Sequence, residues 1–257
     1  MSKFNIVLAK QYNYDQWQEM IVGKPARFIW QFLLQQDIFP GWKLNTSLPI
    51  RSEEGQVTQT QLWLEDQTEN GSQLRIDVIS CSSQQKAMET MLEVLGDFQG
   101  PILSDSRKLD LFIGDVAYTG QTEAPAFLVF LQANMVVRIL NAGQKISSVL
   151  PFARQLNGLW VGENEHHEDQ KIKPEFKSFT IAEEKPIPSK PIRLLFDAKD
   201  LLNRPLWYRM SAAEGEFLSE GDQVFFQNSR KGKFEIQAEA INPNGGSAQA
   251  ALEITID

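Results

Sequence analysis

The residues with the most obvious potential for chemistry are two adjacent histidines, His166 and His167, inside the acidic run 163–169. Imidazole and carboxylate groups are the ligands that zinc and other transition ions take. Adjacent side chains of an extended chain point in opposite directions, however, and the H-E-x-x-H spacing of a helical zinc site is absent. We therefore predict a solvated segment here, and a metal site at His166 and His167 is the weaker alternative.

A nucleophilic mechanism would have to use one of these two histidines as its base, because the chain has no others. There is no G-x-S-x-G sequence, no phosphate-binding glycine loop and no dinucleotide fingerprint. Cys81, the only cysteine, falls between a predicted strand and a predicted helix, where a small packed side chain is more common than a nucleophile. We therefore assign no catalytic residue, expect no cofactor, and favour a protein that is not an enzyme.

A second candidate site comes from aromatic residues near the N-terminus. Tyr14, Trp17 and Trp42 stand among polar or turn residues. Exposed aromatic rings can stack on sugar rings or anchor a protein partner. Packing in the core is the competing interpretation. If the rings are exposed, these three residues form a ligand-binding surface for a protein or a carbohydrate.

Oxygen-bearing side chains leave two further alternatives open. The chain has 33 Asp and Glu residues, so a hydrolase that uses carboxylates of the N-terminal part is an alternative to a binding protein. In the C-terminal part, calcium would find side-chain oxygens on Asp197, Asp200, Asn242 and Asn244. The ladder of alternating acids that calcium loops use is missing, and turn chemistry accounts for the asparagines, so we assign no metal to them.

The composition is that of an acidic globular protein. Of the 257 residues, 42% are hydrophobic and 23% are charged, and the formal net charge is −8. This charge opposes binding to nucleic acid or to anionic lipid, because both need clustered Lys and Arg. No apolar run approaches the roughly 20 residues that span a bilayer. We expect neither nucleic acid nor a membrane span, and the oligomeric state stays open.

The elements of residues 1–161 predict an α+β domain, with a mainly antiparallel sheet and packed helices. Apolar stripes predict helices over 24–36, from Ser82 or Ser83 to Gly96, and from about 147 to 156. Apolar and β-branched runs predict strands at 57–64, 74–79, 109–118, 126–131 and 135–140. The run 127–131 is apolar without alternation, which is typical of a central strand covered on both faces.

The elements of residues 191–257 predict an all-β domain. Residues 162–190 are rich in charge and proline and predict a linker, with a candidate strand at 176–181. Apolar and polar residues alternate over 234–240 and again over 248–256, which predicts a terminal hairpin. Shorter strands are predicted ahead of it at 192–196, 206–210 and 223–226.

Four short runs in this region resemble bacterial immunoglobulin-like domains of the PKD and cadherin-like kind. The runs are Arg204-Pro205-Leu206-Trp207-Tyr208, Gly232-Lys233-Phe234-Glu235-Ile236, Ala240-Ile241-Asn242 and Gly246-Ser247-Ala248. The resemblance covers about residues 187–257 and implies an Ig-like β-sandwich. In such families this domain serves as a spacer, an adhesion module or an accessory to an enzyme outside the cytoplasm.

The N-terminal part resembles small α+β sensor or lipoprotein-type domains over Leu74–Ser80, 112–117 and 127–139, and this implies no residue role. The leading hypothesis is a non-enzymatic, extracytoplasmic binding or accessory protein, with an Ig-like domain as spacer or adhesion module. The carboxylate-dependent hydrolase and a structural or assembly component are the alternatives. We expect a periplasmic, cell-surface or secreted protein if a signal peptide precedes this sequence in the cell, and a cytoplasmic protein otherwise.

Overall fold

The computed structural model describes residues 3–21, 24–53, 55–66, 71–98, 102–122, 124–162 and 172–257. Antiparallel β-sheet is the main structure of these residues, which confirms the β-rich part of the predicted fold class. Contacts divide the chain into two units. Of the described residues, unit 2 contains 24–33, 82–84 and 172–257, and unit 1 contains the others. The predicted ranges 1–161, 162–190 and 191–257 were continuous, whereas these units are not.

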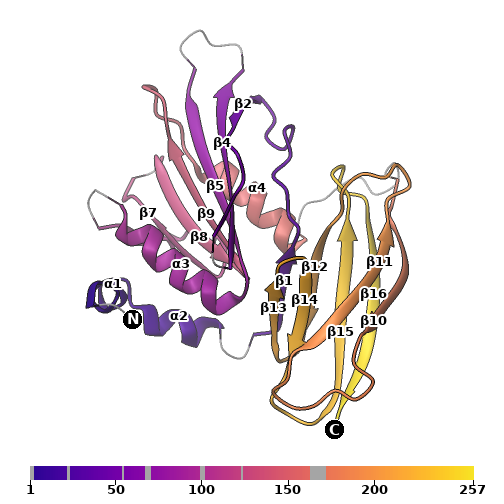
Figure 1. Ribbon diagram of the computed structural model, residues 1–257. Helices are drawn as coiled ribbons and strands as arrows, with labels where there is room; N and C mark the ends of the chain where they lie inside the picture. Colours follow the sequence, from indigo (N-terminus) through magenta and orange to yellow (C-terminus); the bar gives the residue numbers. More distant parts are fainter. Residues whose placement is uncertain are drawn as a thin grey trace. The chain divides into compact units, whose positions relative to one another are not determined.

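Unit 1 is built on one antiparallel sheet with the strand order β2-β4-β5-β9-β8-β7-β6, and β3 pairs with β4 (Figure 1). The strands are β2 (Trp42–Ser47), β3 (Arg51–Glu53), β4 (Gln56–Glu65), β5 (Gln73–Cys81), β6 (Ser104–Asp105), β7 (Val116–Thr119), β8 (Phe127–Gln132) and β9 (Met135–Asn141). The helices that accompany them are α1 (Lys3–Gln11), α2 (Tyr14–Ile21), α3 (Gln84–Gly96), the 3-10 helix η1 (Ser106–Leu109) and α4 (Leu150–Val161). The hairpin β4–β5, helix α3 and strands β8 and β9 confirm the predictions for these segments.

Helices cover both faces of this sheet. On β8, Val129 and Leu131 belong to a core cluster with the buried residues of α3, while Phe130 faces the other way and its ring lies 5.9 Å from that of Trp160 on α4. The buried stripe of α3 is the predicted one, Ala87, Met88, Met91, Leu92 and Leu95. The unbroken apolar run in β8 therefore does form a central strand that is covered on both faces, as predicted. Helix α4 begins at Leu150, with its proline in the first turn where it costs no hydrogen bond.

The predicted helix at 24–36 is wrong. Ala26–Trp30 forms strand β1, and this strand belongs to unit 2. Its apolar residues fit a helical stripe, but Phe28 is 1% exposed because it fills the core of unit 2, and Gln31 leaves the strand with a left-handed φ of 56°. Packing across a sheet has overruled local helix periodicity. The predicted strand at 109–118 is also shortened, to Val116–Thr119.

Unit 2 consists of two four-stranded antiparallel sheets, with the orders β1-β12-β15-β16 and β10-β11-β14-β13 (Figure 1). Side chains from both sheets share one core, where for example the rings of Phe28 and Phe217 lie 6.1 Å apart. The strands after β1 are β10 (Glu175–Ile181), β11 (Ile192–Lys199), β12 (Trp207–Ala212), β13 (Glu216–Glu220), β14 (Gln223–Gln227), β15 (Gly232–Ile241) and β16 (Ser247–Ile256). The terminal hairpin β15–β16 and strands β11, β12 and β14 confirm predictions, and β13 was not predicted.

Candidate anion-binding site

A buried carboxylate lies in the middle of the sheet of unit 1. Asp77, on β5, is 1% exposed. Its Oδ1 accepts hydrogen bonds from Thr60 Oγ1 at 2.7 Å and from Arg75 Nε at 3.0 Å. Its Oδ2 accepts one from Arg138 Nε at 2.7 Å, and Arg138 Nη2 is also 2.7 Å away. A buried charge is tolerated when it is paired in this way.

The pleat of the sheet brings these four residues to one face. Thr60 on β4 and Arg138 on β9 are the direct register partners of Asp77 on its two sides. Arg75 lies two residues before Asp77, and residues i and i+2 of a strand share a face. The cluster therefore combines one acid, one hydroxyl and two guanidinium groups from three neighbouring strands.

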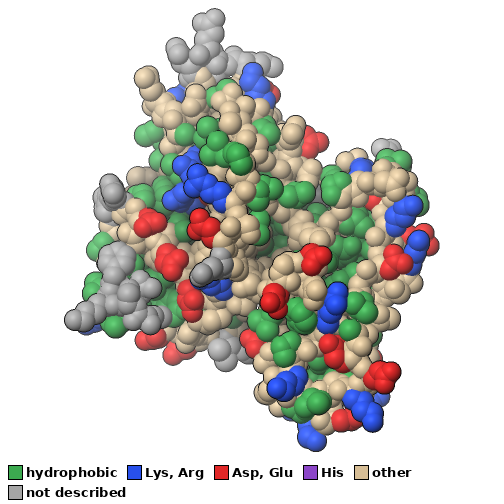
Figure 2. All heavy atoms as spheres, in the orientation of Figure 1, with side chains coloured by type: hydrophobic (Ala, Val, Ile, Leu, Met, Phe, Trp, Pro, Cys, Tyr) green, Lys and Arg blue, Asp and Glu red, His purple; other side chains and the backbone are tan. Residues whose placement is uncertain are grey.

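Both arginines remain accessible to solvent. The side chain of Arg75 is 39% exposed and that of Arg138 is 28% exposed. A guanidinium has five N–H donors, and the donor that Arg75 directs at Asp77 is Nε–H. Two positive charges face one negative charge, so the cluster carries a surplus charge of one. Figure 2 shows Lys and Arg side chains gathered on this side of unit 1, above the position of α3 in Figure 1.

Apolar side chains flank this arginine pair. Leu62 on β4 and Leu140 on β9 are the register partners of Arg75, and both are partly exposed. The surface therefore offers a fork of N–H donors beside two aliphatic side chains. Such a fork suits a carboxylate or phosphate oxygen pair, because guanidinium groups bind these anions through two parallel hydrogen bonds.

No protein-family model, curated protein or solved structure matches the chain. A function therefore has to be inferred from the geometry of the chain itself. Within the part of the chain that the structure describes, no group of three or more His, Cys, Asp or Glu side chains converges as metal ligands do, and no helix is long and apolar enough to cross a bilayer. His166 and His167 lie outside the described residues.

Two of the three predicted aromatic site residues lie in the core. Tyr14 is 2% exposed and Trp17 is 1% exposed, and their rings are 5.3 Å apart. Trp17 Nε1 donates a hydrogen bond to the Tyr118 hydroxyl at 3.0 Å. Burial raises the pKa of Tyr118 to about 12, so its hydroxyl stays protonated well above neutral pH, and it donates a hydrogen bond to the carbonyl oxygen of Tyr12.

The third predicted residue lies elsewhere in unit 1. Trp42 is partly exposed on β2, and its ring packs edge-on against Phe152 of α4 at 4.9 Å. It therefore lies on the α4 side of the sheet, whereas Trp17 packs with the cluster on the α3 side. The structure does not bring Tyr14, Trp17 and Trp42 together on one exposed surface. Ligand binding by any of them stays a prediction.

Cys81 and the oxygen-rich loops have structural partners. Burial raises the pKa of the Cys81 thiol to about 11, which disfavours the reactive thiolate. In unit 2, Asp200 and Asn242 do come together, since Asn242 Nδ2 donates to Asp200 Oδ2 at 3.0 Å. The cation beside Asp200 is the guanidinium of Arg204, which binds both carboxylate oxygens at 2.8 Å and lowers the pKa of that carboxyl group. This pairing leaves calcium no free carboxylate at Asp200.

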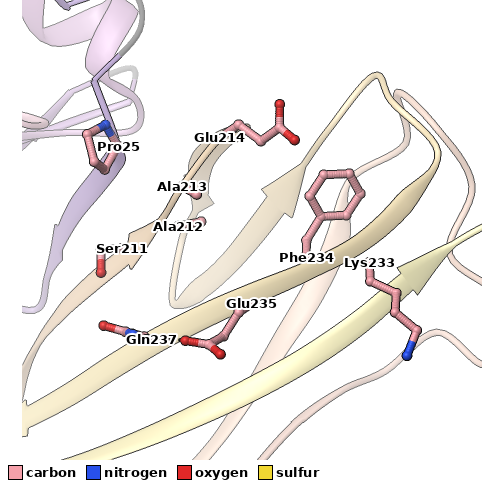
Figure 3. Close-up of a pocket in the computed structure, with 9 residues that line it drawn as sticks. All are labelled: Pro25, Ser211, Ala212, Ala213, Glu214, Lys233, Phe234, Glu235 and Gln237. Atoms are coloured by element: carbon pink, nitrogen blue, oxygen red, sulfur yellow. Dashed lines mark hydrogen bonds between the residues drawn. The ribbon is translucent and has the colours of Figure 1, made fainter.

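A pocket of about 360 Å³ opens in unit 2 beside the start of β1 (Figure 3). Its charged residues already have partners: Lys233 pairs with Glu253 at 2.9 Å, Glu214 pairs with Arg230 at 2.7 Å, and Glu235 accepts a hydrogen bond from Gln237 Nε2 at 2.9 Å. Figure 3 shows the carboxylates of Glu214 and Glu235 pointing to opposite sides. They do not form the converging pair that acid–base hydrolysis needs.

The arginine cluster was missed at the level of sequence. The available signal was the presence of charged residues inside predicted strands, Arg75 and Asp77 in 74–79 and Arg138 in 135–140. Charged side chains are rarely buried unless they are paired, so each of them implied a partner. The strand register that identifies the partner is a tertiary property and required the structure.

Proposed function

We propose that the chain is a non-enzymatic binding or accessory protein that acts outside the cytoplasm, and that unit 1 recognises an anionic group of its ligand. The observation that carries the proposal is the pair of half-exposed arginines, Arg75 and Arg138, held in place by the buried carboxylate of Asp77. Side chains already fixed by a partner lose less conformational freedom when a ligand binds, so binding costs less.

The surplus charge also favours a binding role. One arginine that binds both oxygens would be enough to neutralise Asp77. The second guanidinium adds a local positive charge in a protein whose formal net charge is −8. A concentrated positive charge on an acidic protein attracts anions to this position and away from the rest of the surface.

We further propose that unit 2 is an Ig-like module that serves as a spacer or adhesion domain. Supporting this, the sheet order β10-β11-β14-β13 and the order β12-β15-β16 correspond to the ABED and CFG sheets of constant-type immunoglobulin domains. Strand β1 is an addition beside β12, the strand in the C position. An extracytoplasmic location rests on this resemblance, and the hydrolase alternative stays a prediction.

Thermal unfolding in the presence of small anions tests the binding function. Inorganic phosphate and succinate are compared with chloride at equal ionic strength, for the native chain and for Arg75→Gln. Arg154→Gln, an exposed arginine on α4, is the matched control. A ligand that binds only the folded state raises stability by about 2.7 kcal/mol at 100 times its Kd. We therefore expect the anions to raise the Tm of the native chain and of Arg154→Gln, and to raise that of Arg75→Gln by less. Equal rises in all three, or none, would reject the site.

A further inference from the structure

Of the described residues, unit 2 takes 24–33 and 82–84 from the N-terminal part of the chain and 172–257 from the C-terminal part. Strands β10 to β16 are consecutive within residues 172–257. Strand β1 comes from residues 26–30 and forms the edge of the sheet beside β12. The chain on each side of β1 continues into unit 1, so this edge strand is contributed by the N-terminal part.

Strand β1 fills a site that has the features of a strand-binding groove. It pairs with β12 over five residues, from Ala26 opposite Ala212 to Trp30 opposite Tyr208. Alternate side chains enter the core: Phe28 is 1% exposed, and the ring of Trp30 lies 5.3 Å from that of Tyr208. Main-chain hydrogen bonds and alternate side-chain pockets are the two elements by which a sheet edge binds an extended peptide. The edge of β12 therefore fits an extended segment with apolar side chains at every second position.

We propose that this edge also accepts β1 from a second copy of the chain, so that two chains exchange the strand. The contacts of β1 with β12 are the same whether the strand comes from its own chain or from another, and this is the condition for strand exchange. Strands β10 to β16 are joined to the N-terminal part of the chain only through the segment that precedes Glu175, so β1 can belong to one copy while β10 to β16 belong to another.

Protein concentration should control the exchange. Within one chain, β1 and the edge of β12 are covalently linked, and such a link gives an effective concentration that can reach the order of millimolar. Exchange between chains competes with this only when the protein folds at high concentration. We therefore expect monomers after dilute refolding and a growing share of exchanged dimers after concentrated refolding.

A disulfide across the β1–β12 pair reports which chain supplies the strand. Arg27 and Ser211 are register partners with Arg27 exposed and Ser211 partly exposed, and directly opposed residues lie within the Cα range of a disulfide. The only native cysteine, Cys81, is buried and does not compete. The full-length Arg27→Cys/Ser211→Cys chain is unfolded, refolded at low or high concentration, oxidised, and separated without reducing agent. We expect a cross-linked monomer at low concentration and a rising share of cross-linked dimer at high concentration.

Refolding the two single-cysteine variants together tests directly whether the strand can come from a second chain. When Arg27→Cys and Ser211→Cys chains are mixed, unfolded and refolded at high concentration, a disulfide between residues 27 and 211 can form only between two chains. Peptide mass mapping identifies it, and each single variant refolded alone is the control for non-specific disulfides. Detection of this cross-link supports the proposal. Its absence, with the double variant forming only cross-linked monomers at every concentration, overturns it, and neither result depends on anion binding by unit 1.

Discussion

The carboxylates of Asp77 in unit 1 and Asp200 in unit 2 are both buried against arginine, and the two networks differ in how exposed the arginine side chains are. In unit 1, Asp77 binds two arginines from its own and a neighbouring strand, with side chains 39% and 28% exposed. In unit 2, Asp200 binds the single Arg204, which is 19% exposed, through both carboxylate oxygens.

The other hydrogen-bond partners of the two carboxylates also differ, and Asp200 is held by more of them. Asp200 Oδ1 also accepts the backbone N–H groups of Leu202 and Arg204, and Asn242 ties its Oδ2 to the β15–β16 turn. This network is closed, with one charge of each sign, and it fixes two loops. The network of Asp77 is open, with a surplus positive charge and spare donors. A closed ion pair stabilises the fold, whereas an open one also has the means to bind a ligand.

The largest expected effect is on the closed network. Arg204→Ala leaves the carboxylate of Asp200 buried without its cation, and breaking a buried pair in this way costs about 3–5 kcal/mol. The free energy of unfolding in urea measures it. Arg230→Ala, which removes an exposed pair with Glu214, is the control and should cost about 0–1 kcal/mol. A cost for Arg204→Ala no greater than the control would show that the closed network does not stabilise unit 2.

The next effect is a difference between Asp77 and Asp200 in how their replacement by asparagine changes the response to phosphate. Asp77→Asn should lower the free energy of unfolding by about 1–3 kcal/mol, because charged hydrogen bonds are lost, but it removes the only negative charge of the cluster. Phosphate should therefore raise the Tm of Asp77→Asn by more than it raises that of the native chain. Asp200→Asn is the matched variant, and because its arginine cluster in unit 1 is intact, phosphate should raise its Tm only as much as it raises that of the native chain. If phosphate raises the Tm of Asp77→Asn no more than that of the native chain, the negative charge of Asp77 does not limit anion binding by the arginine pair.

A smaller effect is expected at the hydroxyl that supports Asp77. Thr60→Val removes the hydrogen bond of 2.7 Å to Oδ1, and should cost about 1 kcal/mol. Because both arginines remain, the response to phosphate should be unchanged. Thr58→Val, on the same strand and the same face, is the control and should stay within about 0.5 kcal/mol of the native chain. A loss of the phosphate response in Thr60→Val would mean that the hydroxyl itself is part of the site.

Mild acid should produce the smallest effect. Arg204 lowers the pKa of Asp200 below its unfolded value of about 3.9, so the stabilisation is complete above that value and is lost as the pH falls through the folded-state pKa. The stability difference between the native chain and Asp200→Asn should thus change little from pH 7 to pH 5 and shrink below pH 4. Urea unfolding across this range measures it. A difference that grows on acidification would contradict the assigned direction.

Local patterns predicted the elements better than their partners. The alternation in 234–240 and 248–256 and the unbroken run 127–131 gave correct strands, since a strand's pattern reflects which of its faces are buried. The helix predicted over 24–36 was wrong because a short apolar run such as the one around Phe28 fits both a strand and a helix, and its spacing alone does not separate the two. Trp17 follows the second of the two interpretations left open, packing in the core, because its polar neighbours in sequence are not its neighbours in the fold. Arg75, Asp77 and Arg138 meet only through strand register, which no local pattern specifies.

The central claim is that Arg75 and Arg138 bind an anion, and the side-chain N–H signals of arginine test it most directly. The Nε–Hε resonances of the full-length, isotope-labelled chain are followed by NMR while inorganic phosphate is added at constant ionic strength. We predict saturable shifts of Arg75 and Arg138 that fit one dissociation constant, with Arg204 and Arg154 unchanged. Shifts that are absent, or that are equal at all four arginines, would contradict the account.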